Sequence, residues 1–208
     1  MFKDRYAAGQ VLANRLKDIK ADLVLGIPRG GVVVASAVAE SLRLPLDIVI
    51  TRKIGAPTQP ELALGAVDPD GEVVWDSKLL SQLKLTMYNV QLTIEVERQK
   101  QEIKRRENLY RHERSGLAKL VNGKTVILID DGMATGSTVG AAVNYLKRHG
   151  VKKIILGLPV ASKEALKRVV EECEEVVVLD TPEYFQAVGQ FYQEFQPVSD
   201  SEVVKLLQ

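Results

Sequence analysis

The spacing of apolar residues predicts that this chain alternates between helices and short buried strands. In residues 5–19, apolar side chains recur at helical spacing, at Ala8, Val11, Leu12, Leu16 and Ile19. The apolar run 23–27 that follows is short and ends in Pro28-Arg29-Gly30-Gly31, which predicts a strand that enters a tight loop. A helix over 32–42 and a strand over 46–50 would complete a strand-helix-strand unit. Such a unit requires a parallel sheet covered by helices.

The second half of the chain repeats this order. The expected elements are a strand at 125–129, a loop at 130–137, a helix at 138–148, a strand at 154–158, a helix at 162–173 and a strand at 176–179. The prediction is therefore an α/β fold, with an open parallel sheet of about five strands flanked by helices. At 208 residues the chain suits one domain, residues 1–208.

The segment between the two halves predicts a hairpin followed by a long helix. Residues 62–67 and 72–75 flank Asp68-Pro69-Asp70-Gly71, whose turn-forming residues suggest a hairpin standing off the sheet, within a flap of about 54–76. Residues 86–114 are highly charged and lack Gly and Pro, so we expect a long helix inside a helical insertion of about 77–115. Because acidic and basic residues alternate there, a solvated helix face is favoured over a nucleic-acid patch.

Composition narrows the classes of function. Lys and Arg total 28 against 27 for Asp and Glu, a net charge of +1, which argues against nucleic-acid or membrane partners. The single cysteine, Cys173, excludes an internal disulfide and is interpreted as a buried thiol rather than a nucleophile. The two histidines, His112 and His149, have no metal-ligand spacing and are expected at the surface. The first 15 residues contain no uninterrupted apolar run, so a cytoplasmic location is expected.

The strongest chemical pattern follows the strand at 125–129. There the strand runs into two carboxylates, Asp130 and Asp131, and then into a small turn at a helix start. Gly136 lets the backbone of this turn approach a ligand, and nearby hydroxyls are carried by Thr135, Ser137 and Thr138. Backbone N–H groups at a helix start suit a dianionic phosphate, whereas adjacent carboxylates need another partner, such as vicinal sugar hydroxyls or a Mg²⁺-bound sugar. The pattern therefore predicts a phosphorylated sugar ligand.

Two other phosphate motifs are absent from the sequence. There is no G-x-x-x-x-G-K-[ST], and residues 26–31 do not form G-x-G-x-x-G, so P-loop and dinucleotide sites lack support. An ordinary strand-to-helix turn capped by Asp would account for one Asp and one Gly, but not for the whole string.

The string also resembles a known motif. Four apolar residues, Asp130-Asp131, three variable positions and Thr135-Gly136-Ser137-Thr138 are similar to the 5-phosphoribosyl 1-pyrophosphate (PRPP) signature of type I phosphoribosyltransferases. In that family the loop holds the 5-phosphate and the acidic pair holds the ribose hydroxyls. The resemblance spans about residues 20–180, and the arrangement is also similar to bacterial and archaeal members without an assigned acceptor. It implies substrate binding by Asp130, Asp131, Gly132, Met133, Ala134, Thr135, Gly136, Ser137 and Thr138.

Two weaker segments fall where the family places pyrophosphate contacts. The first, after the strand at 23–27, is formed by Pro28, Arg29, Gly30 and Gly31. The second, after the strand at 46–50, contains Arg52 and Lys53 and resembles the segment that reaches pyrophosphate in orotate and adenine enzymes. Taken alone, these segments would be an ordinary turn and an exposed basic pair.

The family reaction displaces pyrophosphate from C1 of the sugar by a ring nitrogen, and Mg²⁺ is the implied cofactor, held mainly by PRPP and water with no direct protein ligand. The implied catalytic residues are Asp130, Asp131, Arg29 and Lys53. A closing flap at 54–64 and the hairpin after it, with Gly55 and Gly65 as candidate hinges, would exclude water.

The acceptor is expected to be a nucleobase or a related compound. Hypoxanthine and guanine enzymes usually carry an acid where this chain has Ala134, so the loop looks nearer to adenine, orotate or competence-protein-like members. A hood at about 181–208 carries rings that either stack on a base or pack against the core, at Tyr184, Phe185, Phe191 and Tyr192.

Two alternatives to a transferase in nucleotide salvage stay open. One is a PRPP-binding regulatory protein without transferase activity, although the neutral composition argues against nucleic-acid binding. The other is a PRPP synthetase-like enzyme, for which no ATP site is evident in the sequence. The resemblance to type I phosphoribosyltransferases also implies a homodimer.

Overall fold

A five-stranded parallel sheet forms the centre of the molecule, which we describe from a computed structural model covering residues 1–57, 59–111 and 116–208. The strand order is β2-β1-β6-β7-β8, and every neighbouring pair is parallel. The strands are β1 (Leu23–Gly26), β2 (Leu46–Ile48), β6 (Thr125–Ile129), β7 (Lys153–Val160) and β8 (Glu175–Asp180). The predicted α/β class and the predicted number of strands are confirmed.

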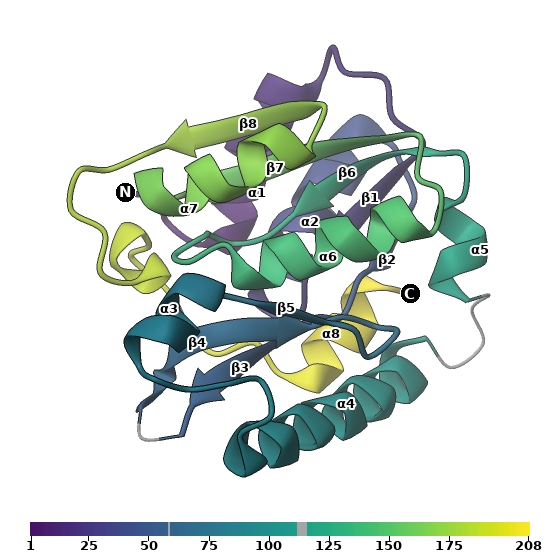
Figure 1. Cartoon of the computed structure of the whole chain (residues 1–208). Helices are drawn as coiled ribbons and strands as arrows, with labels where there is room; N and C mark the ends of the chain where they lie inside the picture. The colour runs from purple at the N-terminus through teal and green to yellow at the C-terminus, as the bar shows by residue number, and fades with distance from the viewer. Residues whose placement is uncertain (58, 112–115) are drawn as a thin grey trace.

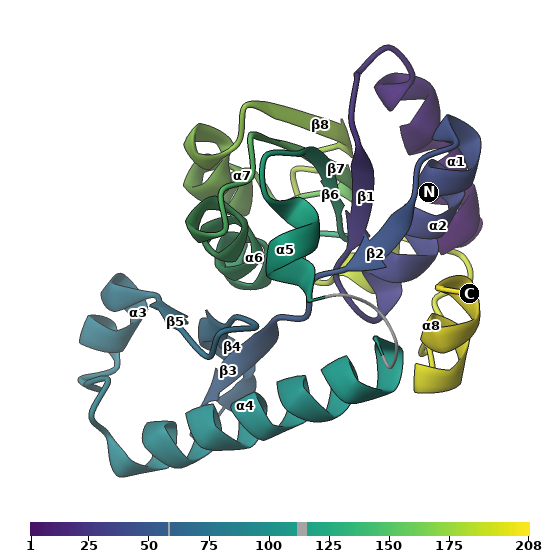
Figure 2. The ribbon, with the colours of Figure 1, turned by 90° about the vertical axis from the view of Figure 1, so that its right-hand side faces the viewer.

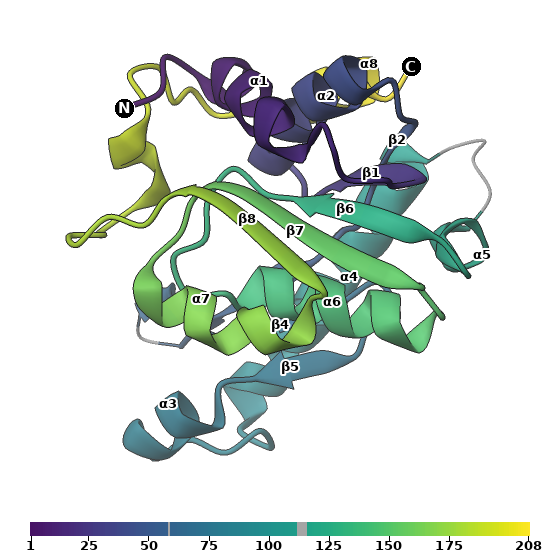
Figure 3. The same ribbon diagram turned by 90° about the horizontal axis from the view of Figure 1, so that it is seen from above.

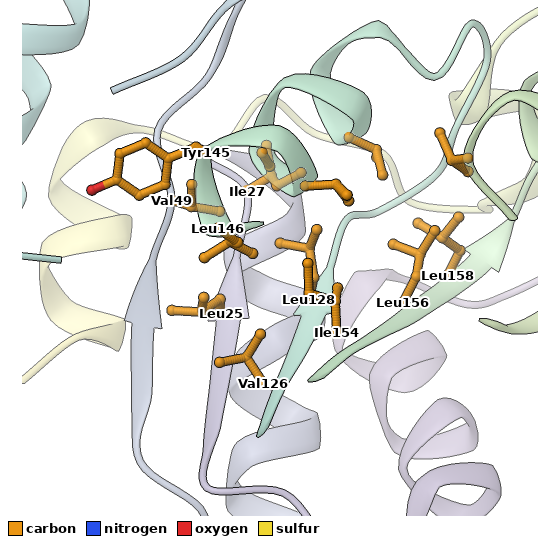
Figure 4. Close-up of a cluster of buried hydrophobic side chains, with 14 of the residues drawn as sticks. Leu25, Ile27, Val49, Val126, Leu128, Tyr145, Leu146, Ile154, Leu156 and Leu158 are labelled. Atoms are coloured by element: carbon orange, nitrogen blue, oxygen red, sulfur yellow. The ribbon is translucent and has the colours of Figure 1, made fainter. Parts of the chain in front are cut away.

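Helices cover both faces of this sheet, as Figure 3 shows from above. One face carries α1 (Arg5–Leu16) and α2 (Gly30–Leu42), and the other carries α5 (Leu117–Val121), α6 (Ser137–Arg148) and α7 (Lys163–Val169). Successive residues of β6 point to opposite faces of the sheet, so this strand contributes side chains to the core on both faces. Val126 and Leu128 pack under α6 in the cluster of Figure 4, whereas Ile127 and Ile129 pack against α1 and α2.

A second, antiparallel sheet stands apart from the first. Its order is β3-β4-β5, with strands β3 (Arg52–Ala56), β4 (Gln59–Val67) and β5 (Val73–Trp75). The hairpin predicted around residues 68–71 is the β4–β5 turn, but the sequence analysis did not identify β3. That strand begins with two charged residues and is bulged around Gly55, which obscures the alternation that places Ile54 and Ala56 in the core.

The β4–β5 turn is anchored to α6, a helix that packs on the parallel sheet. Asp68 is fully buried and accepts hydrogen bonds from the backbone N–H groups of Asp70 and Glu72. Arg148, at the end of α6, donates to the carboxylates of Asp68 at 2.6 Å and Asp70 at 2.9 Å. These contacts therefore fix this end of the hairpin sheet to α6, the helix that begins at Ser137.

The charged helix is α4 (Val90–Tyr110), which runs beneath the hairpin sheet (Figure 2). One stripe of it is buried, at Leu92, Val96, Gln99, Ile103, Arg106 and Tyr110. This spacing of three and four packs α4 against the hairpin sheet and α8 (Asp200–Leu206), so only the rest of the helix is a solvated face. The short α3 (Ser77–Gln82) precedes it. The predicted end of this helix, with His112, lies outside the described residues.

The sheet order places a topological switch between β1 and β6. From β1 the chain moves outward to β2, and from β6 it moves in the opposite direction through β7 to β8. In open α/β sheets the loops at the carboxyl ends of two such strands diverge and leave a crevice for ligands. Here those loops are residues 27–29, which lead into Gly30 and Gly31 at the start of α2, and residues 130–136. Within the described residues, no helix has both the length and the apolar character required to cross a membrane.

Candidate functional site

The two loops at the switch point are in direct contact. A Cβ atom added to Gly30 would lie 1.9 Å from Asp131 Oδ2, and one added to Gly31 would lie 2.8 Å from Asp130 Cα. Only glycine leaves room for this approach. The structure therefore brings together two segments singled out in the sequence, Gly30-Gly31 and the acidic pair, although about 100 residues separate them.

The acidic pair is largely enclosed. Burial, followed by the neighbouring charge of Asp131, raises the pKa of Asp130 well above its ordinary value. Burial also raises the pKa of Asp131, and the hydrogen bond and charge of Arg5 oppose that rise. Arg5 Nε donates to Asp131 Oδ2 at 2.7 Å. The pair is thus two carboxylates in a poorly solvated place with one cation beside them.

The turn after the acidic pair is the most open part of the site. Ala134 and Thr135 are exposed, and Gly136 has φ +81°, a left-handed conformation that favours glycine. Ser137 and Thr138 begin the twelve-residue helix α6, and the hydroxyl oxygens of Thr135 and Ser137 lie 3.2 Å apart. An exposed turn with hydroxyls at the start of a three-turn helix can bind an anion through N–H and O–H donors.

Two of the predicted binding residues, Gly132 and Met133, make structural contacts. The Met133 side chain is buried in the core, its N–H donates to Val160 O, and its carbonyl accepts from Ser162 N–H. At Gly132 an added Cβ would lie 2.6 Å from a methyl group of Val188, which belongs to the predicted hood. Gly132 and Met133 therefore shape the loop and seat the hood on it.

Arg29 lies at the rim of the site. The Pro28–Arg29 peptide bond is cis, and Arg29 precedes the first residue of α2. Its Nη1 lies 3.5 Å from Asp200 Oδ1 on α8, where Asp200 also accepts hydrogen bonds from Arg105 and Tyr110. Although partial burial acts in the opposite direction, the hydrogen bonds from Tyr110 and Arg105 lower the pKa of Asp200 to about 2. A carboxylate with a lowered pKa thus lies beside Arg29.

Arg52 and Lys53 lie on β3, in the hairpin sheet against which α4 packs. Arg52 Nε donates to Gln99 Oε1 at 2.8 Å, and both basic residues line a cavity of about 390 Å³ together with Glu95 and Arg98. Burial, and then the positive charge of Arg106, lowers the pKa of Arg52, with Arg29 contributing as well. The structure therefore turns the Arg52 side chain toward α4.

The predicted flap corresponds to the β3–β4 hairpin and its continuation into β5. Gly55 and Gly65 are inside its ladder, where an added Cβ would lie 2.4 Å from Pro60 O and from Val74 O respectively. Close packing accounts for glycine at both positions without a hinge. Thr58, in the predicted flap, lies outside the described residues.

The hood is formed by the segment after β8, drawn in yellow in Figure 1, which curls over the edge where the parallel strands end. Of the four rings considered for base stacking, Tyr184 is 83% exposed, whereas Phe185 and Phe191 pair with ring centroids 5.1 Å apart. Tyr192 is buried, and its hydroxyl donates to the backbone oxygen of Asp131 at 2.5 Å. Tyr192 therefore packs against the site, and Tyr184 has the largest free surface.

Sequence reasoning did not find Arg5. It lies at the first position of α1, after the N-cap Asp4, and contacts a residue 126 positions away. The only sequence signal was an arginine at a helix start, where a cation is unfavourable. That signal does not identify Asp131 as the partner of Arg5.

The chain is similar to known proteins of one family. A family model described as "Phosphoribosyl transferase domain" matches residues 5–194. A Mycobacterium tuberculosis protein named "Putative phosphoribosyl transferase" is 41% identical over 210 residues, which is 100% of this chain and 46% of that protein. The chain therefore spans about half the length of this curated relative.

Solved structures show the same fold. The crystal structure of TT1426 from Thermus thermophilus is 41% identical, covers 99% of this chain and 97% of that chain, and has a TM-score of 0.79. A purine phosphoribosyltransferase from Pyrococcus horikoshii is 17% identical, covers 94% of this chain and 92% of that chain, and has a TM-score of 0.51. The second likeness supports the fold alone.

Proposed function

Because this chain belongs to the phosphoribosyltransferase family, we propose that it binds PRPP with Mg²⁺ and transfers the phosphoribosyl group to a nitrogenous acceptor. One observation carries this proposal: the loop after β1 and the loop after β6 touch at the switch point, with Gly30 and Gly31 packed on Asp130 and Asp131. This arrangement supports a ligand with a phosphate at one end and a second anion at the other.

In this proposal each part of PRPP has its own contacts. The 5-phosphate binds the turn at residues 134–138, where Thr135 is exposed and α6 begins. The ribose hydroxyls donate to the carboxylates of Asp130 and Asp131. The pyrophosphate meets the loop at residues 28–31, with Arg29 at its rim and Lys53 of β3 on the α4 side.

Mg²⁺ fits this arrangement as an ion bound mainly by substrate oxygens and water. Among residues 1–57, 59–111 and 116–208, no group of three or more His, Cys, Asp or Glu side chains could hold a metal ion. Mg²⁺ commonly keeps several waters and binds substrate phosphates rather than an all-protein cage. When bound, it supplies positive charge that stabilises pyrophosphate as a leaving group.

The transfer breaks the C1–O bond to pyrophosphate and forms a C1–N bond to the acceptor, whose nitrogen supplies the electron pair. Positive charge grows on the sugar as the leaving group departs. In this proposal Asp130 and Asp131 hold the sugar and interact favourably with that charge, while Arg29 and Lys53 stabilise the pyrophosphate. The role of this chain's residues is thus placement and charge.

The acceptor class we propose is a nucleobase or a related nitrogen compound. Ala134 is exposed at the position where 6-oxopurine enzymes usually carry an acid, which supports an acceptor other than hypoxanthine or guanine. Among the hood's aromatic side chains, Tyr184 is 83% exposed and has the largest free surface for stacking on a flat base. We also propose a homodimer acting in cytoplasmic nucleotide salvage; light scattering tests the dimer.

Pyrophosphate release from Mg²⁺ and PRPP, measured across a panel of nucleobases and related heterocycles, tests the proposal. We expect acceptor-dependent release with a product of the corresponding mass, abolished in the Asp130→Asn/Asp131→Asn variant. If the protein binds PRPP by calorimetry but releases no pyrophosphate with any acceptor, the alternative of a PRPP-binding regulator replaces the transferase. Absence of PRPP binding would refute both.

A further inference from the structure

Arg5 is held from three directions at the edge of the site. Its Nε donates to Asp131 Oδ2 at 2.7 Å, and its Nη1 donates to the backbone oxygen of Gln196 at 2.8 Å. Its guanidinium carbon lies 3.7 Å from the centroid of the Phe195 ring. Only 11% of the Arg5 side chain is exposed. A planar guanidinium fixed by an acceptor on each of two nitrogens and by a ring on its face has little freedom to turn.

The carboxylate that Arg5 holds is the one nearest the β1 loop. Asp131 Oδ2 is the atom that a side chain on Gly30 would strike. The backbone N–H of Asp131 donates to Asp130 Oδ1 at 2.8 Å, and its carbonyl accepts from Tyr192 Oη. The side chain of Asp131 is thus oriented by Arg5, while its backbone is oriented by Asp130 and Tyr192.

The charged and titratable groups that face Asp131 are Asp130, Arg5 and Tyr192. Burial raises the pKa of Asp131, and Arg5 opposes that rise. Without the cation, two adjacent buried carboxyl groups favour sharing a proton. A protonated carboxyl group has lost an acceptor site that a sugar hydroxyl needs.

We propose that Arg5 is a positioning residue, which holds the Asp131 carboxylate ionised and correctly turned to accept the ribose hydroxyls of PRPP. The inference rests on the proposed function, and it deepens that function by adding a residue from the first helix to the sugar subsite. In this inference Arg5 acts through its hydrogen bond to Asp131.

Calorimetry with PRPP and Mg²⁺ on Arg5→Gln, Arg5→Lys and the control Arg15→Gln tests this role. Arg15 is exposed near the other end of the same helix, so its variant carries the same chemical change away from the site. We expect Arg5→Gln to raise the Kd about tenfold or more, as loss of a charged hydrogen bond would. Arg5→Lys, which keeps the charge but not the fork, should recover part of the affinity, and Arg15→Gln should match wild type.

The pH dependence separates this role from a merely structural one. We expect the ratio of the Arg5→Gln Kd to the wild-type Kd to grow as the pH falls from about 8 to 6, because the unneutralised pair takes up a proton more easily. Titration of PRPP itself cancels in this ratio. With Arg5→Lys the ratio should stay nearly constant, which a simple loss of packing would not produce.

Phe195→Leu keeps the charge of Arg5 and removes the ring beneath it, so it serves if Arg5→Gln does not fold. We expect it to raise the Kd about threefold, in line with a lost cation–π contact. Equal PRPP affinity in wild type, Arg5→Gln and Phe195→Leu at every pH would overturn the positioning role and leave the proposed function intact. A wild-type protein that binds no PRPP would overturn both.

Discussion

Gly31→Ala tests the contact between the two loops, because the atoms it would meet are mostly backbone. The new Cβ would lie 2.8 Å from Asp130 Cα and 3.0 Å from Ile129 O. Carbon atoms in ordinary contact are about 3.5 Å apart or more, so a loop must move by about 0.7 Å. Such overpacking costs about 1–3 kcal/mol, while replacing glycine in a helix returns up to about 1 kcal/mol. We expect a net loss of ~1–2 kcal/mol.

The matched control is Gly140→Ala. Gly140 is also near the start of a helix, α6, and an added Cβ would have no atom of the described residues within 4 Å beyond its own helix. Alanine there should stabilise the protein by up to ~1 kcal/mol. For a domain of this size, 1 kcal/mol shifts Tm by about 2–4 °C. Scanning calorimetry should therefore show Gly31→Ala melting roughly 3–6 °C below wild type and Gly140→Ala melting at or above it.

PRPP titration of the same two proteins completes the test. Moving Asp130 away from the β1 loop should raise the PRPP Kd about tenfold in Gly31→Ala, because hydrogen bonds to charged groups depend strongly on geometry. Gly140→Ala should bind as wild type does. If both variants shift Tm upward and bind PRPP equally well, the loops are not in the tight contact from which the site was inferred.

Three further predictions concern the surroundings of the site. A hydrogen bond from Arg105 lowers the pKa of Glu102 from 4.5 to about 2, so its contribution to stability is present above pH 4.5 and is lost as the pH falls toward 2. The stability deficit of Glu102→Gln should therefore shrink over that range in thermal scans. Tyr192→Phe should lower the free energy of unfolding in urea by about 1–2 kcal/mol, since a buried carbonyl loses its donor. Asp200→Asn should tighten PRPP binding about fivefold, or ~1 kcal/mol, by removing a negative charge near Arg29; weaker binding would mean that Asp200 orients that arginine instead.

The central sheet could be predicted because each of its strands is a short apolar run bounded by turn residues. The candidate site could be predicted after β6, because Asp130 and Asp131 come directly after the buried residues of that strand. β3 escaped notice because Arg52 and Lys53 begin it and a bulge at Gly55 interrupts its alternation. α8 did have a usable signal: Ser199 and Glu202 form a reciprocal capping box at its start.

The part of the site that depends on distant contacts could not be predicted. The partners of Arg5 lie 126 and 191 positions away, and no local pattern encodes such a pair. The neighbour of Arg29, Asp200, lies on a helix that the sequence assigned only to a general hood. Local sequence thus identified the loops, and tertiary packing determined which charges meet there.

The three contacts of Arg5 can form only in a fixed order while the chain is being synthesised. Arg5 leaves the ribosome before its partners, the carboxylate of Asp131 follows much later, and Phe195 and Gln196 come later still. Domains generally fold as units once enough of the chain has emerged. Once β8 has emerged every strand of the main sheet is present, yet the proposed sugar subsite lacks two of the three groups that immobilise Arg5 until residue 196 is free. A nascent chain halted after β8 would therefore contain all the strands of the main sheet but lack two of the contacts that fix Arg5.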